Sequence, residues 1–208
     1  MHQHLKSKFK SLPATIRGGI WMILAGIFFT FIGVMIRMAN KEVHVLEIVF
    51  FRYFISLIIM VPWMMRRGLI GLKAKNLPIL FARGLSSYIG AIFWFASMIY
   101  LPLAEATALG YTAPLFATLG AVLFLGEIVG RRRWWALAAG FIGTLIILRP
   151  GIETISLPAL YAIGGAIFIA NSALLVKVLN RTESPETIVL YMGIFSTPLS
   201  LGAAIFFW

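Results

Sequence analysis

Few residues in this sequence could do chemistry, and the most informative is a cation inside an apolar run. Arg52 lies eight residues past His44, which corresponds to about 12 Å along a helix. A cation at that depth in a bilayer costs at least about 2.5 kcal/mol unless it is paired or hydrated. We interpret Arg52 either as a substrate-binding residue or as one partner of a buried ion pair, and the sequence leaves both readings open.

Three other charged residues are candidates for a pair or for ion coupling. Glu47 is five residues from Arg52, about 140° around a helix, and is not a natural partner on the same helix. Glu105 could approach Arg52 if their helices pack together, so we predict that pair. Arg83 lies about 9 Å inside the apolar run that begins at Leu77. For this residue we favour anchoring at the membrane interface over contact with a substrate.

Polar and aromatic side chains at mid-depth form the second group of candidates. Aromatic residues in lipid usually pack, whereas an amide in hydrocarbon needs a partner on another helix or on a substrate. Asn171 is therefore the more telling residue of this group. The candidates for contact with a substrate, besides Arg52, are Tyr88, Trp94, Tyr111, Thr112 and Asn171.

A proline predicts an interruption in the most apolar part of the chain. Pro114 has no N–H and cannot bond to the carbonyl of Gly110. We expect a kink and a partly free carbonyl at this point. Transporters use discontinuous helices of this kind near the membrane midplane, although many prolines in membrane helices only shape the packing.

The residue types needed for catalysis or metal binding are missing. The chain has no Cys and no Asp, and two of its three His fall in the first four residues. Disulfides, thiolate metal sites and His–Asp acid–base pairs are therefore excluded. No G-x-x-x-x-G-K-[ST] sequence is present for ATP binding. We predict that the protein is not an enzyme and holds neither a metal nor a cofactor.

The composition requires a membrane. The 208 residues are 61% hydrophobic and 12% charged, and their mean hydropathy is +0.95, whereas soluble proteins are about 45–50% apolar. The net charge of +11 would suit nucleic-acid binding. However, Lys and Arg occur in short clusters between the apolar runs and not as one continuous face. We infer that the partner is the lipid bilayer and that nucleic acid is excluded.

Seven apolar runs predict an all-α, polytopic membrane helix bundle. A span needs roughly 20 residues to cross about 30 Å of hydrocarbon. The fourth and fifth runs form a hairpin around the basic segment Arg131-Arg132-Arg133. We expect Glu127, at the end of the fourth run, to form a local ion pair with these arginines. The predicted spans are Gly18–Met38, Val45–Met64, Leu77–Tyr100, Leu103–Gly126, Trp134–Leu148, Leu157–Leu179 and Glu186–Trp208.

The distribution of cations orients the bundle. Residues 1–17 form a basic arm without an acid, and Pro150-Gly151 ends the fifth span. With the N-terminus inside, the inner segments carry thirteen Lys and Arg and the outer segments carry three. The positive-inside rule therefore places the N-terminus in the cytoplasm.

The sixth span repeats the outline of the first. Each is an apolar helix that ends in a cation and an Asn and is followed by a short polar link and a helix with an early Glu. The matching pairs are Trp21 with Tyr161, Arg37 with Lys177 and Asn40 with Asn180 at an offset of 140, and Gly26 with Gly165 and Glu47 with Glu186 at 139.

This duplication predicts two inverted units, because a unit of five spans is odd and its second copy must enter the membrane upside down. Residues 18–150 are the first five-helix repeat, and residues 151–208 start the second with two helices. We therefore expect the chain to be truncated at its C-terminus, and the alternative is a complete protein of seven spans. Inverted repeats mark secondary transporters, which bind their substrates near the midplane between the repeats.

Several motifs together resemble one family. They are FFRYFISL from Phe50, RG at Arg83, PLAEATAL from Pro102, APLF from Ala113, LGE from Leu125 and GFIGTLIILRPG from Gly140. In this combination the chain resembles the EamA-type transporters of the drug/metabolite transporter superfamily. The resemblance covers the first five spans well and the last two loosely.

The resemblance implies ten helices in two inverted repeats, both termini in the cytoplasm, and a central cavity in the bacterial inner membrane. It implies secondary transport of a small organic metabolite or drug by alternating access, and it is nearest to members that carry S-adenosylmethionine or riboflavin. Glu47 or Glu105 is then the acid available for proton coupling. The alternative functions are a non-transporting scaffold and an inactive fragment of a carrier. The sequence does not decide whether the chain forms a homo-oligomer.

Overall fold

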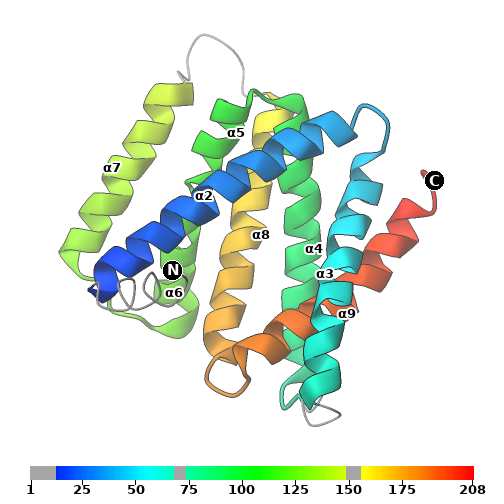
Figure 1. Cartoon of the computed structure of the whole chain (residues 1–208). Helices are drawn as coiled ribbons and strands as arrows, with labels where there is room; N and C mark the ends of the chain where they lie inside the picture. Colours follow the sequence, from blue (N-terminus) through cyan, green and yellow to red (C-terminus); the bar gives the residue numbers. More distant parts are fainter. Residues whose placement is uncertain (1–12, 68–73, 149–155) are drawn as a thin grey trace, which may run out of the picture.

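A computed structural model of the chain describes residues 13–67, 74–148 and 156–208. The elements in these ranges are α-helices packed as a bundle (Figure 1). Residues 1–12 of the basic arm and the predicted helix end at Pro150-Gly151 lie outside the described residues. The helices are α2 (Ala14–Ala39), α3 (Val45–Arg67), α4 (Leu77–Tyr100), α5 (Leu103–Gly110), α6 (Ala113–Leu125), α7 (Arg131–Leu148), α8 (Leu157–Leu179) and α9 (Pro185–Ala204).

Within the described residues, six stretches are long and apolar enough to cross a membrane. They are α2, α3, α4, α5 together with α6, α8 and α9. The all-α polytopic fold predicted from the sequence is therefore confirmed. α7 coincides with the fifth predicted span, but three of its 18 residues are the arginines at its start. The remaining fifteen are fewer than the roughly 17 that a span needs, although α7 runs alongside α5 and α6 (Figure 1).

The fourth predicted span is broken in its middle. α5 ends at Gly110 and α6 begins at Ala113. Pro114 has no N–H to donate to the Gly110 carbonyl, so the regular hydrogen bonding of the helix stops there. It starts again when the Leu115 N–H donates to the Thr112 carbonyl at 3.0 Å. The predicted kink at Gly110 and Pro114 is confirmed.

α4 is the centre of the bundle and packs against α2, α3, α5, α8 and α9. Its contact with α8 depends on two glycines. A Cβ on Gly165 would lie 3.1 Å from the backbone nitrogen of Trp94, and a Cβ on Gly90 would lie 3.1 Å from the Cβ of Phe168. Small residues at such contacts let helices approach closely in lipid, where dispersion between packed surfaces drives association.

Trp94 lies in the core where α4, α5 and α8 meet, with 7% of its surface exposed. Its ring fills the space that a side chain at position 110 would need, because a Cβ on Gly110 would lie only 2.3 Å from Cη2 of Trp94. The tight packing therefore requires a glycine beside the helix break. These contacts favour a packing role for Trp94 over the predicted contact with a substrate.

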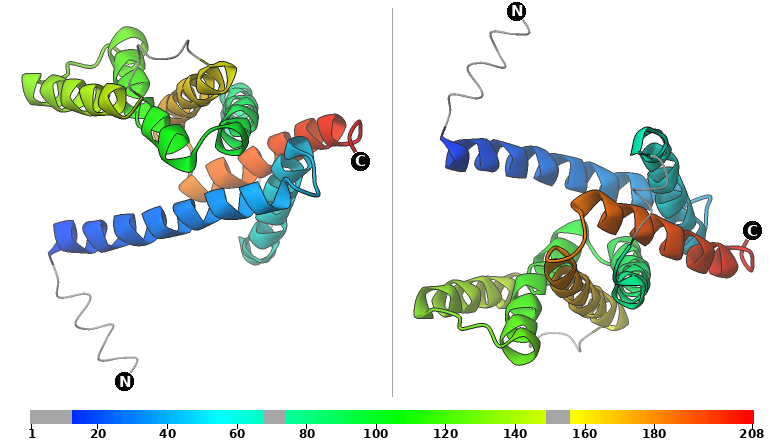
Figure 2. Two further views of the ribbon diagram at one scale, coloured as in Figure 1. Left: turned by 90° about the horizontal axis from the view of Figure 1, so that it is seen from above. Right: turned by 90° about the horizontal axis from the view of Figure 1, so that it is seen from below.

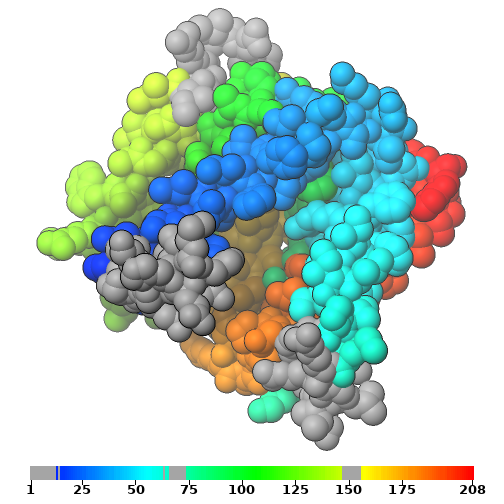
Figure 3. All heavy atoms as spheres, in the orientation of Figure 1, coloured from blue at the N-terminus to red at the C-terminus, as the bar shows by residue number. Residues whose placement is uncertain are grey.

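The helices form two layers when the bundle is seen along its length. α4 to α8 lie on one side, and α2, α3 and α9 lie on the other (Figure 2). The N-terminal half of α2 stands clear of α5 to α7 in both views of Figure 2, and only 11% of its apolar window is buried. The space-filling view shows a hollow between α2 and α3, with α8 and α9 at its floor (Figure 3).

The turns that follow α2 and α8 have the same backbone hydrogen bonds. The Asn40 N–H donates to the Ile36 carbonyl and the Asn180 N–H donates to the Val176 carbonyl, each at 2.9 Å. Four further bonds match at an offset of 140, as far as the first turn of the next helix. Gly26 with Gly165 and Glu47 with Glu186, which were matched at an offset of 139, differ by one residue from this alignment. The two turns lie at opposite ends of the bundle (Figure 1).

We expect Gly110→Ala to destabilise the bundle by about 1–3 kcal/mol, because the added methyl group would overlap the Trp94 ring. Unfolding titrated in mixed detergent micelles measures this loss. Gly26→Ala is the matched control, since a Cβ at that position meets nothing within 4 Å. Adding Trp94→Phe to Gly110→Ala should restore part of the stability. Equal stability of the two alanine variants would contradict this packing.

Candidate functional site

α3 and α9, the helices that follow the two matching turns, pack against each other. At their crossing, a Cβ on Gly193 would lie 3.2 Å from Cδ1 of Leu57. With the offset of 140, the counterpart of Gly193 is Tyr53, one turn before Leu57. The crossing therefore brings together equivalent parts of the two matching segments. Transporters with inverted repeats hold their substrates between such segments.

Tyr53 places an unused donor inside this crossing. It is 1% exposed, and its hydroxyl has no hydrogen-bond partner among the described residues. The polar groups around the hydroxyl are the guanidinium groups of Arg52 and Arg83 and the hydroxyl of Ser196. Ser196 Oγ is already engaged, because it donates to the Gly84 carbonyl at 3.0 Å. A buried hydroxyl without a partner costs about 1–3 kcal/mol.

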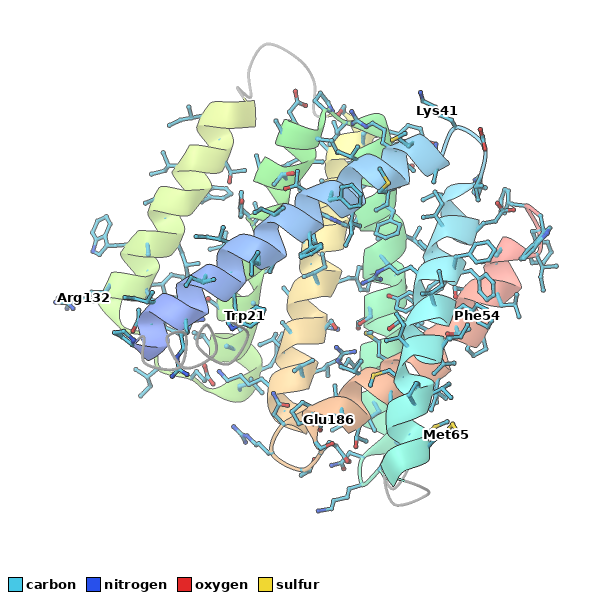
Figure 4. All side chains as sticks on the ribbon, viewed as in Figure 1. Trp21, Lys41, Phe54, Met65, Arg132 and Glu186 are labelled. Carbon is cyan, nitrogen blue, oxygen red and sulfur yellow. The ribbon has the colours of Figure 1, made fainter. Side chains whose placement is uncertain are left out.

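Arg52 lies over aromatic rings and not beside a carboxylate. Its guanidinium carbon is 4.9 Å from the ring centre of Tyr53 and 5.7 Å from that of Phe95. Cation–π contacts of this length are favourable, and they leave the N–H donors of the guanidinium available. The side chain of Arg52 as a whole is exposed. The neighbouring Phe54, labelled in Figure 4, is also exposed, whereas Tyr53 between them is buried.

The predicted pair of Arg52 with Glu105 is wrong. No ion pair joins these two side chains in the described part of the chain. The physical reason is the packing of α3, which lies against α4 and α9, so the nearest partners of Arg52 are rings. Glu47 also has a local role, because its Oε2 accepts the His44 N–H at 3.1 Å at the start of α3.

Arg83 approaches the same hydroxyl from α4. Its Nε and Nη1 are buried and have no hydrogen-bond partner among the described residues. Tyr53 is the residue with which its charge interacts. The prediction that Arg83 serves mainly as an interfacial anchor therefore does not fit these two nitrogens, which face the bundle interior.

Tyr88 completes a group that we call the tyrosine–arginine cluster: Arg52, Tyr53, Arg83 and Tyr88. Tyr88 is half-buried, packs against the central core and lies within electrostatic range of Tyr53. Tyr53 is about 12 Å from the start of α3, and Arg83 is about 9 Å from the start of α4, which begins at the opposite end of the bundle (Figure 1). The cluster is therefore well inside the apolar zone.

Sequence reasoning singled out three members of this cluster and missed Tyr53. An aromatic residue in a membrane helix usually packs, and nothing in the sequence separated Tyr53 from the other aromatic residues around it. The available signal was its position directly after Arg52. Only the packing of α3 on α9 shows that its hydroxyl is buried without a partner.

Asn171 bonds to another helix, which was one of its two predicted alternatives. Its Nδ2 donates to Ser86 Oγ at 2.7 Å, and the neighbouring hydroxyls of Ser172 and Ser87 lie 2.9 Å apart. These two links connect α8 to α4 in the same register. Asn171 therefore serves the α4–α8 contact in this structure.

A groove lies where the broken helix faces α7. It is a half-open groove of about 380 Å³ between the α5–α6 break and the small residues of α7. Tyr111 is 70% exposed there, whereas Thr112 is buried and donates to the Leu109 carbonyl at 2.6 Å. Thr144 Oγ1, also in the lining, donates to the Ala108 carbonyl at 3.2 Å. The lining residues are Tyr111, Thr112, Pro114, Leu115, Ala136, Leu137, Gly140, Phe141, Gly143 and Thr144.

Comparison with known proteins decides the family. The model of the EamA-like transporter family matches residues 16–149, which include the helix break, Arg52 and Arg83. The chain belongs to the EamA-like transporter family. The resemblance found in the sequence is confirmed, together with the prediction of a transporter family and not an enzyme family.

Relatives of this EamA-like chain carry several transporter names. A riboflavin transporter of Rhizobium johnstonii is 34% identical over 90% of the chain and 63% of its own length. An S-adenosylmethionine uptake transporter of Rickettsia prowazekii is 28% identical over 95% and 67%. A pseudopaline exporter of Pseudomonas aeruginosa is 27% identical over 88% and 65%. The chain thus spans about two thirds of the length of these relatives. No solved structure matches it significantly.

Charged residues at the helix ends of this EamA-like chain hold neighbouring helices together. Glu127 forms an ion pair with Lys177 of α8, so the predicted local pair with Arg131–Arg133 is wrong. The hydrogen bond from Lys177 is the main cause that lowers the pKa of Glu127. Desolvation opposes it, and the charges of Lys177, Arg133 and Arg181 lower the pKa further. The pair joins the stretch that follows α6 to α8.

We expect no energetic coupling between Arg52 and Glu105. In a double-mutant cycle with Arg52→Gln and Glu105→Gln, the two changes in unfolding free energy should add within about 0.5 kcal/mol, because the side chains are not in contact. The cycle of Lys177→Gln with Glu127→Gln is the positive control, since those side chains form an ion pair. Coupling above about 1 kcal/mol for Arg52 and Glu105 would contradict the arrangement.

Proposed function

We propose that the protein is a secondary carrier that moves a small organic solute across a membrane by alternating access. The observation that supports this most is the tyrosine–arginine cluster, in which buried donors of Tyr53 and Arg83 without partners lie at the crossing of α3, α4 and α9. Polar groups inside a membrane bundle are costly, and their usual reason is a solute or ion pathway. The names of the relatives support the same function.

The movement that we propose is a rocking of the two repeats about the α3–α9 crossing. This crossing contains the close approach of Leu57 to Gly193, and it joins the equivalent helices of the two matching segments. The hollow between α2 and α3 gives the solute a route towards the cluster (Figure 3). The Gly110–Ala113 break adds backbone groups outside regular hydrogen bonding, which carriers use near the midplane.

We propose residues 18–150 as one repeat and residues 151–208 as the beginning of an inverted second repeat. The matching turns at opposite ends of the bundle support this division. The cation distribution supports a cytoplasmic N-terminus, and the bacterial relatives support a place in the inner membrane. Of the solutes in the names of relatives, riboflavin and S-adenosylmethionine are the first to test.

The transport proposal is tested in proteoliposomes that contain the purified protein. We expect saturable uptake of radiolabelled S-adenosylmethionine or riboflavin above that of empty liposomes. Tyr53→Phe should lower the initial rate at least about fivefold, because it removes a buried polar group that we place in the pathway. Tyr100→Phe is the matched control, since Tyr100 is exposed at the end of α4. A rate equal to that of empty liposomes for both solutes, and for pseudopaline in the efflux direction, would contradict the proposal.

The inverted topology is tested with single cysteines, which the chain allows because it has none of its own. Lys41 and Arg181 are equivalent at the offset of 140, and both are exposed. We expect an impermeant maleimide to label Lys41→Cys in intact cells and Arg181→Cys only after permeabilisation. Arg132→Cys is the control for the inner side, because the cation distribution assigns the basic segment Arg131-Arg132-Arg133 to the inside. Labelling of both equivalent positions from one side would overturn the inverted repeat.

A further inference from the structure

We propose that the tyrosine–arginine cluster recognises an anionic group of the solute, either a carboxylate or a phosphate. This inference rests on the proposed carrier function and names the chemical class of its substrate. The cluster combines two cations with a buried hydroxyl, and three of its donors, Tyr53 Oη and the Nε and Nη1 of Arg83, have no hydrogen-bond partner among the described residues.

The first argument is the balance of charge. Arg52 and Arg83 lie in the apolar zone, and no carboxylate forms an ion pair with either of them in the part of the chain that the structure describes. The Glu residues of the described ranges lie in turns or in the first turn of a helix, where two of them accept backbone N–H groups. Two cations without a counter-charge in a low-dielectric environment favour an anion from outside the protein.

The second argument is the direction of hydrogen bonding. Tyr53 Oη and the Nε and Nη1 of Arg83 are buried and have no partner among the described residues. Guanidinium nitrogens can only donate, and a tyrosine hydroxyl donates well. The ligand that satisfies all three atoms is therefore rich in acceptors. Carboxylate and phosphate oxygens are the acceptors with which arginine forms its strongest hydrogen bonds.

The third argument is access. A fully enclosed cation would be a structural element, but the side chain of Arg52 is exposed and that of Arg83 is only partly buried. Arg52 rests on the rings of Tyr53 and Phe95, so its charge is held in place without a polar partner. The donors of the cluster are thus held in place, and the cluster is open on the side of Arg52. A binding site needs both properties.

The proposal also discriminates among the solutes of the relatives. S-adenosylmethionine carries a carboxylate, whereas riboflavin has no anionic group at neutral pH. We therefore expect the cluster to favour a solute of the first kind. A lipid headgroup also offers a phosphate, but the cluster lies about 9–12 Å from the helix ends, deeper than a headgroup resides.

The test measures binding separately from transport. The full chain is reconstituted in phosphatidylcholine nanodiscs, and its thermal unfolding is followed while benzoate, phenyl phosphate or benzamide is added. Benzamide is the neutral counterpart of benzoate with nearly the same shape. We expect benzoate or phenyl phosphate to raise the unfolding midpoint at concentrations at least tenfold below those at which benzamide does so.

Variants then locate the site. Arg83→Gln should weaken the apparent affinity for the anion at least tenfold, and Tyr53→Phe should weaken it about threefold. Arg83→Lys, which keeps the charge, is the variant to use if Arg83→Gln does not fold, and it should retain more affinity than Tyr53→Phe combined with Arg83→Lys. Arg132→Gln, at the exposed start of α7, is the matched control and should leave the affinity unchanged.

Each result decides one of the two proposals. Equal effects of benzoate and benzamide, or an anion effect that Arg83 and Tyr53 variants do not change, would overturn the anion site even if transport is observed. Loss of the anion effect in nanodiscs that contain phosphatidylglycerol would assign the cluster to lipid headgroups and overturn solute recognition. Anion binding with the expected dependence but no solute flux in proteoliposomes would uphold the site and contradict the carrier function.

Discussion

Hydrocarbon offers no hydrogen bonds, so each polar group inside this bundle has to find its partner within the protein. The helix ends follow this rule. Arg37 donates to the Met98 carbonyl at 2.9 Å where α4 ends, and Glu183 accepts the N–H groups of Lys75 and Asn76 at 2.6 and 2.9 Å where α4 begins. Both ends of the central helix are thus satisfied by side chains from other helices or turns. In the part of the chain that the structure describes, Tyr53 Oη and the Nε and Nη1 of Arg83 do not follow this rule.

Close packing around α4 makes these polar links possible. Glycines at the α4–α8 contact bring the two backbones near enough for Asn171 to reach Ser86. The same central helix carries Trp94, which fills the space beside Gly110 where the fourth span breaks. Packing, hydrogen bonding and the interruption of the span are therefore parts of one arrangement. A bundle built in this way is rigid around α4 and less constrained around α2, whose N-terminal half has few contacts.

The similarity of two segments of the chain relates this packing to the proposed function. The turns after α2 and α8 share their backbone bonds but lie at opposite ends of the bundle. Their following helices cross beside Tyr53, so the polar cluster lies where two equivalent segments meet. Arg37 and Lys177 are equivalent cations, and each makes a contact between helices at its own end. These two anchors at opposite ends, with the tyrosine–arginine cluster between them, agree with the proposed alternating-access carrier.

The sequence by itself determined the membrane environment, the helical fold and the break at Pro114, because these depend on local hydropathy and on the chemistry of one proline. It predicted seven spans, whereas six of the described stretches are long and apolar enough to cross a membrane. It also indicated Arg52, Arg83 and Tyr88, since rare polar residues stand out in apolar runs. The pairing of side chains was different. The sequence suggested Arg52 with Glu105 and Glu127 with the following arginines, whereas the structure places Arg52 on aromatic rings and Glu127 on Lys177. Only the tertiary structure decided these contacts and the role of Tyr53, because they depend on which helix faces lie together, and hydropathy is nearly the same on every face of a helix surrounded by lipid and apolar neighbours.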